Sequence, residues 1–283
     1  MSRNLDSLSM DIINAILQRK SCRTYNPGSL KPSDRKLLQE FIYTHKTGIN
    51  NKSVDFILVE KNETEVPMKI PYGLITGNKT YILGKTFSTP IARTNYGYML
   101  ERIVLKATEM KLGTCWVGLF DREYFNDIQV EKDLDIPSIL VIGYAQDKMP
   151  IKEKLIRKAV NADKRKPWET LFFNYESGEV LSSETIQPYE ETLKMTRLAP
   201  SAGNTQPWRI FYSTVGSEFH FYKKPINKSY DEKGMHDIDM GIAMCHFELV
   251  SAKNGLKGNW TKYPDEQLKS INGLEYISTW KCD

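Results

Sequence analysis

The sequence has no long run of hydrophobic residues, although its 283 residues leave room for one. The longest apolar stretch, Ile139–Ala145, is much shorter than the roughly 20 residues that cross a bilayer as a helix. The first ten residues are polar and contain Arg3 and Asp6, unlike a secretory signal. We therefore expect a cytoplasmic protein with no membrane partner.

Cysteine is scarce. Cys22, Cys115, Cys245 and Cys282 lie far apart, with no C-x-x-C pair and no histidine at metal-ligand spacing. This pattern argues against a zinc site and against a disulfide framework. We expect free thiols and no bound metal ion.

The sequence also lacks a large excess of charge of either sign. The 39 Lys and Arg residues face 35 Asp and Glu residues, for a net charge of +4. A nucleic-acid-binding protein concentrates far more positive charge, so we expect no nucleic acid partner. With 40% hydrophobic and 26% charged residues, the composition is that of a globular protein with one large domain or two fused ones.

Hydrophobic spacing predicts helices and strands without strict alternation, which indicates an α+β fold with mixed sheets wrapped by helices. Ser9 is the expected N-cap of the first helix, and Gly113 the expected left-handed residue after the third. The predicted helices are 10–20, one that follows Ser33 with Leu37, Leu38, Phe41 and Ile42 on one face, 95–112, 188–198 and 239–254. The predicted strands are 54–60, 81–83, 139–145, 208–213 and 274–279.

The second part of the chain partly repeats the first. Four pairs of identical residues are separated by 144 positions: Gly97 and Gly241, Leu105 and Leu249, Leu112 and Leu256, and Trp116 and Trp260. We therefore expect two similar halves, 1–173 and 188–283, joined by a polar linker at 174–187 and related by a pseudo-two-fold axis.

Three segments could carry chemistry. In Arg19-Lys20-Ser21-Cys22-Arg23, an extended chain would point Arg19, Ser21 and Arg23 to one side as an anion site, although such cations also suit a helix C-terminus. The segment 199–208 combines two prolines with amide side chains in a loop suited to a polar heterocycle, or forms an ordinary turn. The segment 113–120 has glycines that allow close approach of a ligand, or forms a helix-to-strand turn around a core tryptophan.

Together these segments resemble the nitroreductase family of FMN-dependent oxidoreductases. Its most specific feature here is Pro-Ser-Ala-Gly-Asn-Thr-Gln-Pro-Trp at 200–208. The string at 19–23 is similar to the family's Arg-x-Ser-x-Arg/Lys element, 163–167 to its basic element, and 112–118 to its turn near the flavin N5. The resemblance covers most of the chain and implies the nitroreductase α+β fold.

The arrangement departs from the usual one, in which two chains pair and the loop comes from the partner. The first half has Thr47-Gly48-Ile49-Asn50-Asn51 where the loop should be, and the second half has the loop without the basic elements. The resemblance therefore implies a fused, degenerate pseudo-dimer. We expect one FMN per chain, bound between the halves, with a monomer sufficient to bind it.

The resemblance implies a role for each candidate residue. Arg23 would stabilise the negative charge that accumulates as the flavin is reduced, so that no side chain acts as nucleophile, acid or base. The phosphate and ribityl contacts fall to Arg19, Lys20, Ser21, Lys164 and Arg165; the contacts near N5 to Trp116, Val117, Gly118 and Leu119; and the ring-edge contacts to Pro200, Ser201, Ala202, Asn204 and Gln206.

The expected reaction passes electrons from NAD(P)H through FMN to a flat, electron-poor small molecule such as a nitroaromatic or quinone. Candidate wall residues for this acceptor are Phe87, Tyr96, Phe120 and Phe125, each of which could equally belong to the core. Two alternatives stay open: a flavin-dependent dehalogenase or flavin-fragmenting relative, and a non-catalytic flavin-binding protein.

Overall fold

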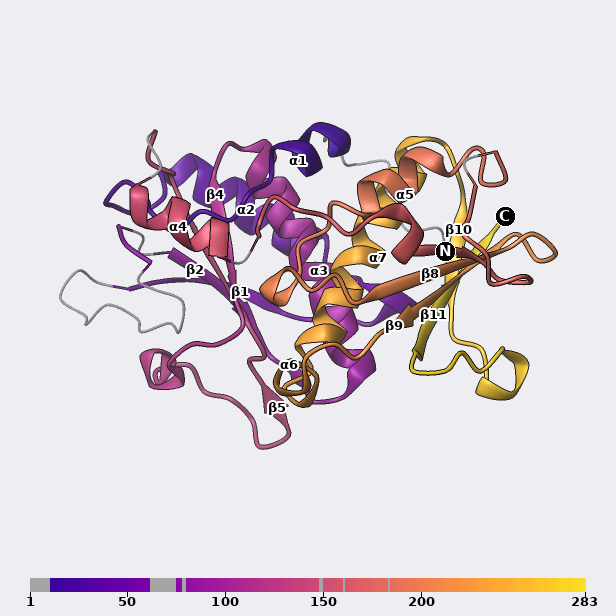
Figure 1. The fold of residues 1–283 in the computed structure, drawn as a ribbon. Coiled ribbons are helices and arrows are strands. Elements are labelled where there is room, and N and C mark those ends of the chain that lie inside the picture. Colours follow the sequence, from indigo (N-terminus) through magenta and orange to yellow (C-terminus); the bar gives the residue numbers. More distant parts are fainter. Residues whose placement is uncertain (1–10, 62–74, 78–79, 148–149, 160, 183) are drawn as a thin grey trace.

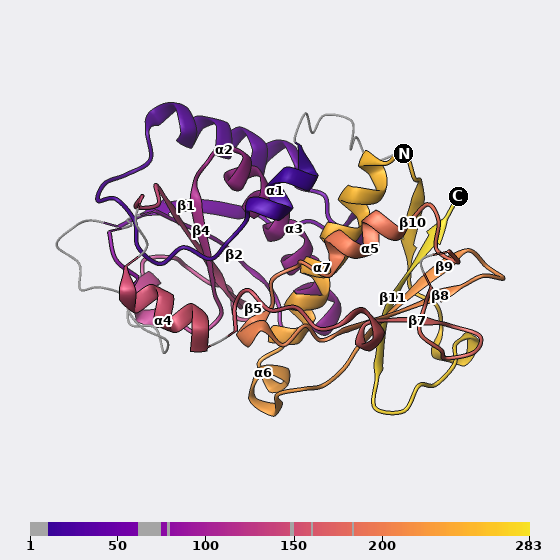
Figure 2. The ribbon, with the colours of Figure 1, turned by 45° about the horizontal axis from the view of Figure 1, so that its top comes forward.

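The computed structural model describes residues 11–61, 75–77, 80–147, 150–159, 161–182 and 184–283. In these residues the chain has a mixed α+β fold, as the sequence predicts. Two long helices, α3 (Pro90–Glu109) and α7 (Met235–Lys253), pack against each other at the centre. Figures 1 and 2 show one sheet on either side of this helix pair.

The first sheet is antiparallel, with the order β1 (Phe56–Glu60), β2 (Thr80–Gly84), β6 (Ile139–Gly143) and β4 (Gly113–Val117). The predicted inner strand at 139–145 is confirmed, and every residue of β2 and β6 is buried. Successive side chains of a strand point to opposite faces. Ile82 and Leu140 accordingly join the core around α3, while Tyr81 and Val141 join a second core on the other face.

The second sheet has the order β10 (Gly258–Thr261), β11 (Glu275–Cys282), β9 (Glu218–Lys223), β8 (Trp208–Ser213) and β7 (Phe172–Asn174). The order β8-β9-β11-β10 repeats the order β1-β2-β6-β4: in each sheet the first, second, fourth and third strands lie side by side. The extra strand, β7, runs parallel to β8.

The position of β7 differs from the predicted boundary between the first half and the linker. The proposed boundary at residue 173 falls inside β7, which belongs to the second sheet. The chain then folds back, since Val180 pairs with Phe173, and Leu181 and Ile186 are buried. The segment 174–187 is therefore packed onto the second sheet instead of crossing open solvent.

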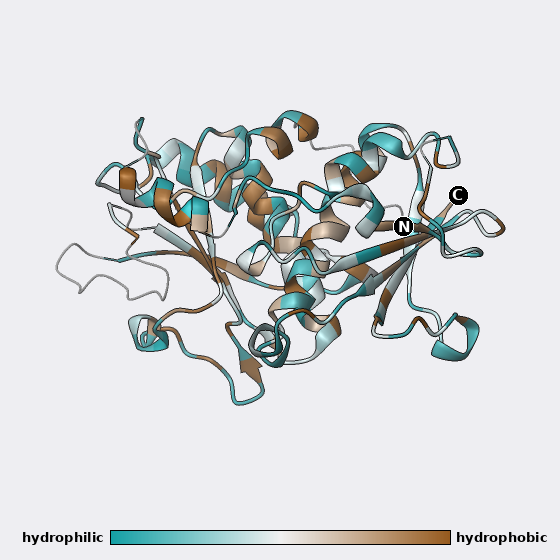
Figure 3. Cartoon of the chain, in the orientation of Figure 1, coloured by the Kyte–Doolittle hydropathy of each residue, from teal (hydrophilic) through white to brown (hydrophobic). Residues whose placement is uncertain are grey.

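The remaining elements surround this frame. Hydrophobic residues concentrate along the strands and central helices, and the outer loops are largely hydrophilic (Figure 3). These elements are α1 (Ile12–Gln18), α2 (Pro32–Thr44), α4 (Ile151–Ala159), α5 (Glu190–Thr196), α6 (Lys228–Glu232), β3 (Thr86–Phe87), β5 (Leu134–Asp135), and the 3₁₀ helices Ile49–Asn51, Arg122–Phe125, Trp168–Thr170, Ala202–Asn204 and Asp265–Gln267. No helix in the described ranges has the length and apolar character to cross a membrane.

Three predicted helix starts need correction. The expected cap Ser9 lies outside the described residues, and α1 begins after Asp11, whose carboxylate accepts a hydrogen bond from the Asn14 amide at 3.1 Å. α3 begins at Pro90, five residues before the predicted start, because Thr89 caps it and proline suits the first turn of a helix. α7 likewise begins at Met235, ahead of Asp239.

The expected left-handed residue after α3 is also wrong. Lys111, with φ of 61°, reverses the chain, and Gly113 is already the first residue of β4. The predicted end of α7 is confirmed, since Gly255 follows it with φ of 73°.

The close contact between α3 and α7 depends on glycine. A Cβ on Gly97 would lie 2.1 Å from the carbonyl oxygen of Ile238, and a Cβ on Gly241 would lie 1.8 Å from that of Thr94. The contacts are reciprocal, because Thr94 and Ile238 are also 144 positions apart. The two helix backbones therefore touch directly.

Candidate functional site

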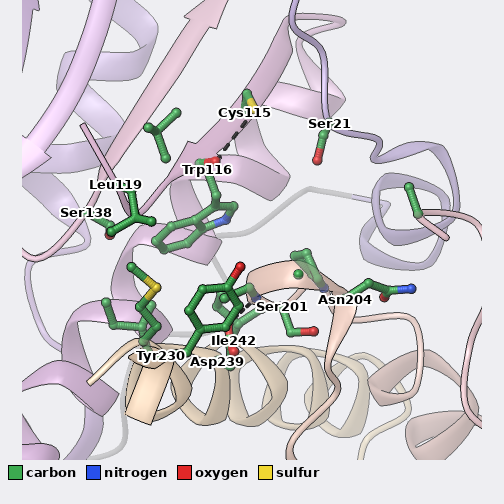
Figure 4. A pocket seen from close by; sticks show the side chains of 18 of the residues that line it. Ser21, Cys115, Trp116, Leu119, Ser138, Ser201, Asn204, Tyr230, Asp239 and Ile242 are labelled. Carbon is green, nitrogen blue, oxygen red and sulfur yellow. Dashed lines mark hydrogen bonds between the residues drawn. The ribbon is translucent and has the colours of Figure 1, made fainter. Parts of the chain in front are cut away.

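A cleft of about 210 Å³ lies between the first sheet and α7. Figure 4 shows Cys115 and Trp116, from β4, on one side, and Asp239 and Ile242, from α7, on the other. Twelve of the fifteen residues predicted for the cofactor site line this cleft: Arg19, Ser21, Arg23, Trp116, Val117, Gly118, Leu119, Arg165, Pro200, Ser201, Ala202 and Asn204.

The segment Arg19–Arg23 runs extended beside β4. Ser21 pairs with Thr114, and the amide of Cys22 donates to the carbonyl of Thr114 at 2.8 Å. The alternation that extended chain imposes places Arg19, Ser21 and Arg23 in the cleft, while Lys20 is exposed to solvent.

Glu153 of α4 fixes the end of this segment. Its carboxylate is buried and accepts hydrogen bonds from the amide of Arg23 and the hydroxyl of Thr24, both at 2.9 Å. α4 thereby holds the backbone of Arg23, while its guanidinium remains directed to the cleft.

The positive side of the cleft has few anionic partners. Burial lowers the pKa of Arg19, and Arg157 lowers it further, against the opposing effect of Glu101. Burial and the nearby Arg19 lower the pKa of Arg165 to about 10. Within the described residues, Nε of Arg19, Nη1 of Arg23 and Nε of Arg165 are buried without a hydrogen-bond partner.

Buried guanidinium nitrogens without acceptors are costly to a folded protein, since each loses its hydration. Ser138, on the same cleft, also has a buried Oγ with no partner in the described part of the chain. This donor set matches an anionic ligand that also accepts hydrogen bonds from a hydroxyl.

The opposite wall is the loop Pro200–Gln206. Its tight path places Gly203, Asn204 and Gln206 at φ values of 56°, 57° and 47°. The side-chain amide of Asn204 donates to the carbonyls of Asn161 at 2.7 Å and Lys164 at 2.9 Å. The loop thus holds the basic segment 161–165 in place.

Three predicted site residues do not line the cleft. Lys20 and Lys164 are exposed, because the alternation at Lys20 and the turn at Lys164 direct them outward. Gln206 is buried beneath the loop, where its Oε1 accepts from the Lys166 amide at 2.7 Å and its Nε2 donates to the Asn204 carbonyl at 3.1 Å. Gln206 therefore supports the loop.

The side chain of Trp116 is hydrogen-bonded to a buried polar pair, Glu101 and His246. Its Nε1 donates to Glu101 at 2.8 Å, and the other Glu101 oxygen lies 3.0 Å from Nε2 of His246. Glu101 and His246 are both fully buried on the two central helices. The indole that faces the cleft is therefore fixed by the α3–α7 contact.

A model of one protein family matches most of the chain. The model of the family described as "Putative TM nitroreductase" matches residues 11–251. The chain belongs to this nitroreductase family. A search of curated proteins finds no match.

One solved structure shares the fold over nearly the whole chain. A "putative nitroreductase (tm1586)" from Thermotoga maritima MSB8 is 21% identical, with a TM-score of 0.61, over 96% of this chain and 93% of that one. A nitroreductase with bound FMN from Bacteroides fragilis NCTC 9343 is 14% identical, with a TM-score of 0.40, over 50% of this chain and 92% of that one.

Sequence reasoning missed Asp239 as a residue of the nitroreductase cleft. Its Oδ1 accepts from the amide of Ala202 at 2.9 Å, and its Oδ2 lies 3.0 Å from Nδ1 of the buried His236. Burial raises the pKa of Asp239. The signal available was His-x-x-Asp at the start of a helix, which places both side chains on one face. Other lining residues that were missed are Cys115, Ser138, Ala162, Gly203, Tyr230, Met235, Ile238 and Ile242.

The predicted aromatic walls are wrong for this cleft. Tyr96 and Phe125 are buried in the two cores, Phe87 lines a separate cavity, and Phe120 lines a groove beside the cleft. The rings that do line the cleft are those of Trp116 and Tyr230. All four cysteines are free, and no metal-binding group of three or more His, Cys, Asp or Glu occurs in the described ranges.

Proposed function

We propose that this chain is an FMN-dependent oxidoreductase that takes electrons from NAD(P)H and passes them to a flat, electron-poor acceptor such as a nitroaromatic or quinone. The observation that carries the proposal is the set of buried guanidinium nitrogens of Arg19, Arg23 and Arg165 that lack partners in the described residues and line one cleft. FMN has the charge and acceptors that this set requires.

The phosphate would be held by Arg19, Ser21 and Arg165. Arginine donors suit phosphate because the planar guanidinium can make two parallel hydrogen bonds. Asn204 and Gln206 support this role indirectly, since they fix the segment that carries Arg165.

When bound, FMN supplies hydride and electron transfer, which side chains cannot perform. Arg23 would provide a fixed positive charge toward the developing negative charge of the reduced ring. Trp116, held by Glu101, would exclude water and limit the thickness of a ligand that enters the cleft.

Access to the cleft favours flat partners. The cleft shares Gly118, Leu119 and Met235 with an adjoining groove lined by Phe120 and Arg122. A donor or acceptor could enter along this groove without opening the core. The ring of Phe120 can stack on a planar, electron-poor molecule, while Arg122 pairs with Asp135 of the same groove.

We also infer that the two halves derive from one duplicated unit, so that a monomer suffices for one FMN. The repeated strand order and the reciprocal contacts of Gly97 and Gly241 support this inference. A further parallel is the capping of both loops: Asp239 accepts from Ala202 at 2.9 Å, and Asn95, 144 positions earlier, accepts from Ile49 at 2.8 Å.

The test is flavin stoichiometry followed by reduction. The purified chain is incubated with FMN, freed of unbound flavin, and the flavin per chain is measured together with the oligomeric state. We expect one FMN per monomer. Anaerobic addition of NADH or NADPH should then bleach the visible flavin absorption, and a nitroaromatic or quinone should restore it.

Each failure has a different meaning. Protein that stays colourless contradicts flavin binding, and two FMN per chain contradicts a single site. Bound flavin that neither NADH nor NADPH bleaches contradicts the proposed donor and favours a non-catalytic flavin-binding protein or a dehalogenase-like relative with another donor.

A further inference from the structure

A second cavity shares no lining residue with the candidate flavin cleft. It has a volume of about 570 Å³ and is formed by both halves, since it is lined by the start of α3 and by β11. Four of its lining residues lie 144 positions from residues that line the flavin cleft: Ile91 and Met235, Thr94 and Ile238, Asn95 and Asp239, and Lys262 and Gly118. The second cavity therefore occupies the position that repeats the cleft.

The chemistry of the two sites differs. Among the residues that the structure describes, no arginine lines the second cavity. Asn95 replaces the carboxylate of Asp239, and its Oδ1 is already used by the Ile49 amide at 2.8 Å. Where the cleft has Gly118, the cavity has the long side chain of Lys262. In the described residues, the cavity therefore has no counterpart of Arg19 and Arg165 to hold a phosphate.

The three charged side chains that line the cavity, Lys52, Lys262 and Glu275, are all exposed to solvent. The ammonium of Lys262 donates to the Tyr276 carbonyl at 2.9 Å and lies 4.2 Å from the centre of its ring. Glu275 pairs with Lys223 at 2.8 Å. An ion entering this cavity would lose its hydration without gaining a buried partner.

Hydrophobic side chains dominate what remains. Phe87 is 56% exposed and Ile91 is 59% exposed, and both lie on this cavity with Val54, Met244 and Ile277. Small-molecule sites in proteins are concave, mostly apolar, and about 300–1,000 Å³ in volume. The hydroxyls of Thr86 and Ser278 add a few polar contacts.

We propose that the second cavity binds an uncharged, mainly apolar small molecule with the size of a few aromatic rings. The site repeats the position of the flavin cleft but has lost the features that bind phosphate. The inference rests on the cavity itself and does not require that the cleft hold FMN.

The test uses two probes that differ by one charge. N-phenyl-1-naphthylamine is uncharged, and 1-anilinonaphthalene-8-sulfonate is the same ring system with a sulfonate. Equilibrium dialysis of the purified full-length chain, with excess FMN in the buffer, should give one equivalent of bound uncharged probe. The sulfonate should bind at least tenfold more weakly.

Two matched substitutions assign the site. Ala92 lines the second cavity and Ala162 lines the cleft. Ala92→Trp should fill the cavity and weaken the uncharged probe at least tenfold while leaving FMN bound. Ala162→Trp should weaken FMN and leave the probe unchanged. Absence of probe binding, equal binding of both probes, or probe binding that survives Ala92→Trp would overturn the proposal.

A second pair covers the case in which Ala92→Trp does not fold. Ile91→Asp places a charge at the cavity, in the first turn of α3, where an acidic residue favours a helix. Ile151→Asp makes the same change in the first turn of α4, at a side chain that is 77% exposed and lines neither site. Only Ile91→Asp should weaken the uncharged probe, and equal effects of the two changes would contradict the assignment.

Discussion

Arg19→Met tests the proposed grip on the FMN phosphate. Arg19 contributes a buried Nε that has no partner in the described part of the chain. A hydrogen bond to a charged group contributes about 1.5–3 kcal/mol. Since 1.4 kcal/mol is about a tenfold change in Kd, we expect the substitution to weaken FMN binding about 10- to 150-fold.

The same substitution should have a different effect on the protein without flavin. Burial and the nearby Arg157 lower the pKa of Arg19, so the charged side chain is held there at a cost. Arg19→Met removes this cost. We expect the flavin-free variant to be at least as stable as the flavin-free wild type, whereas the stabilisation that FMN adds should shrink.

The assay compares FMN with riboflavin, which has the same ring and lacks the phosphate. Quenching of flavin fluorescence gives both Kd values, and thermal denaturation with and without FMN gives the two stabilities. Lys20→Met is the matched control, because Lys20 is the adjacent cation and is exposed outside the cleft. It should leave both Kd values unchanged.

Two results would refute this reasoning. Wild-type affinity of Arg19→Met for FMN would show that Arg19 does not hold the phosphate. An equal loss for FMN and riboflavin would show that Arg19 acts on the ring or on the fold, and not on the phosphate.

Four further substitutions test the frame around the cleft. Glu101→Gln should destabilise the protein by about 1–3 kcal/mol in a urea titration, because Gln has one acceptor oxygen for the two buried contacts that Glu101 makes with Trp116 and His246. Gly97→Ala and Gly241→Ala should each cost at least about 1–3 kcal/mol by the same measurement, since each new Cβ would overlap a carbonyl of the facing helix. Lys166→Met should stabilise the flavin-free protein more at pH 7 than at pH 10. Burial, with Arg209 and Lys224, lowers the pKa of Lys166 in the folded protein to about 8. The unfolded value is about 10.4, so the folded protein carries no penalty from this group above that pH. As the pH falls from about 10.4 to about 8, the unfolded chain takes up the proton first, and the folded protein loses stability that Lys166→Met should restore.

Each of these has a control on the same chain. Glu190→Gln breaks an exposed pair with Lys194 and should leave the urea midpoint unchanged. Gly216→Ala places its Cβ against the flexible side chain of Glu218 and should be tolerated. Lys164→Met, at an exposed neighbour, should leave the urea midpoint unchanged. A variant that behaves like its control would contradict the corresponding argument.

Local sequence patterns predicted much of the frame, because helix and strand periodicity depend on neighbouring residues. The strand Trp208–Ser213 has the predicted bounds, and the inner strand at 139–145 is buried as expected. Helix starts that depend on a capping residue do not follow from periodicity alone. Thr89-Pro90 was available as a signal for the start of α3, and the apolar stripe from Leu100 onward did not reveal it.

The alternation of Arg19, Ser21 and Arg23 is likewise a property of the sequence. Extended chain has a period of two residues, so three alternate side chains share one face wherever the segment lies. The sequence therefore determined that Arg19, Ser21 and Arg23 share one face. The same alternation points Lys20 away from the cleft, against the role that the resemblance implied for it.

Tertiary structure alone decided how the polar groups of the loop are used. The partners of Asn204 lie 40 and 43 residues away in the chain, and Gln206 bonds the amide of Lys166. Asp239 bonds the loop from 37 residues away. Hydrogen bonds between distant segments leave no periodic signal in the sequence. Only the folded contacts therefore show which amides support the loop and which donors remain for a ligand.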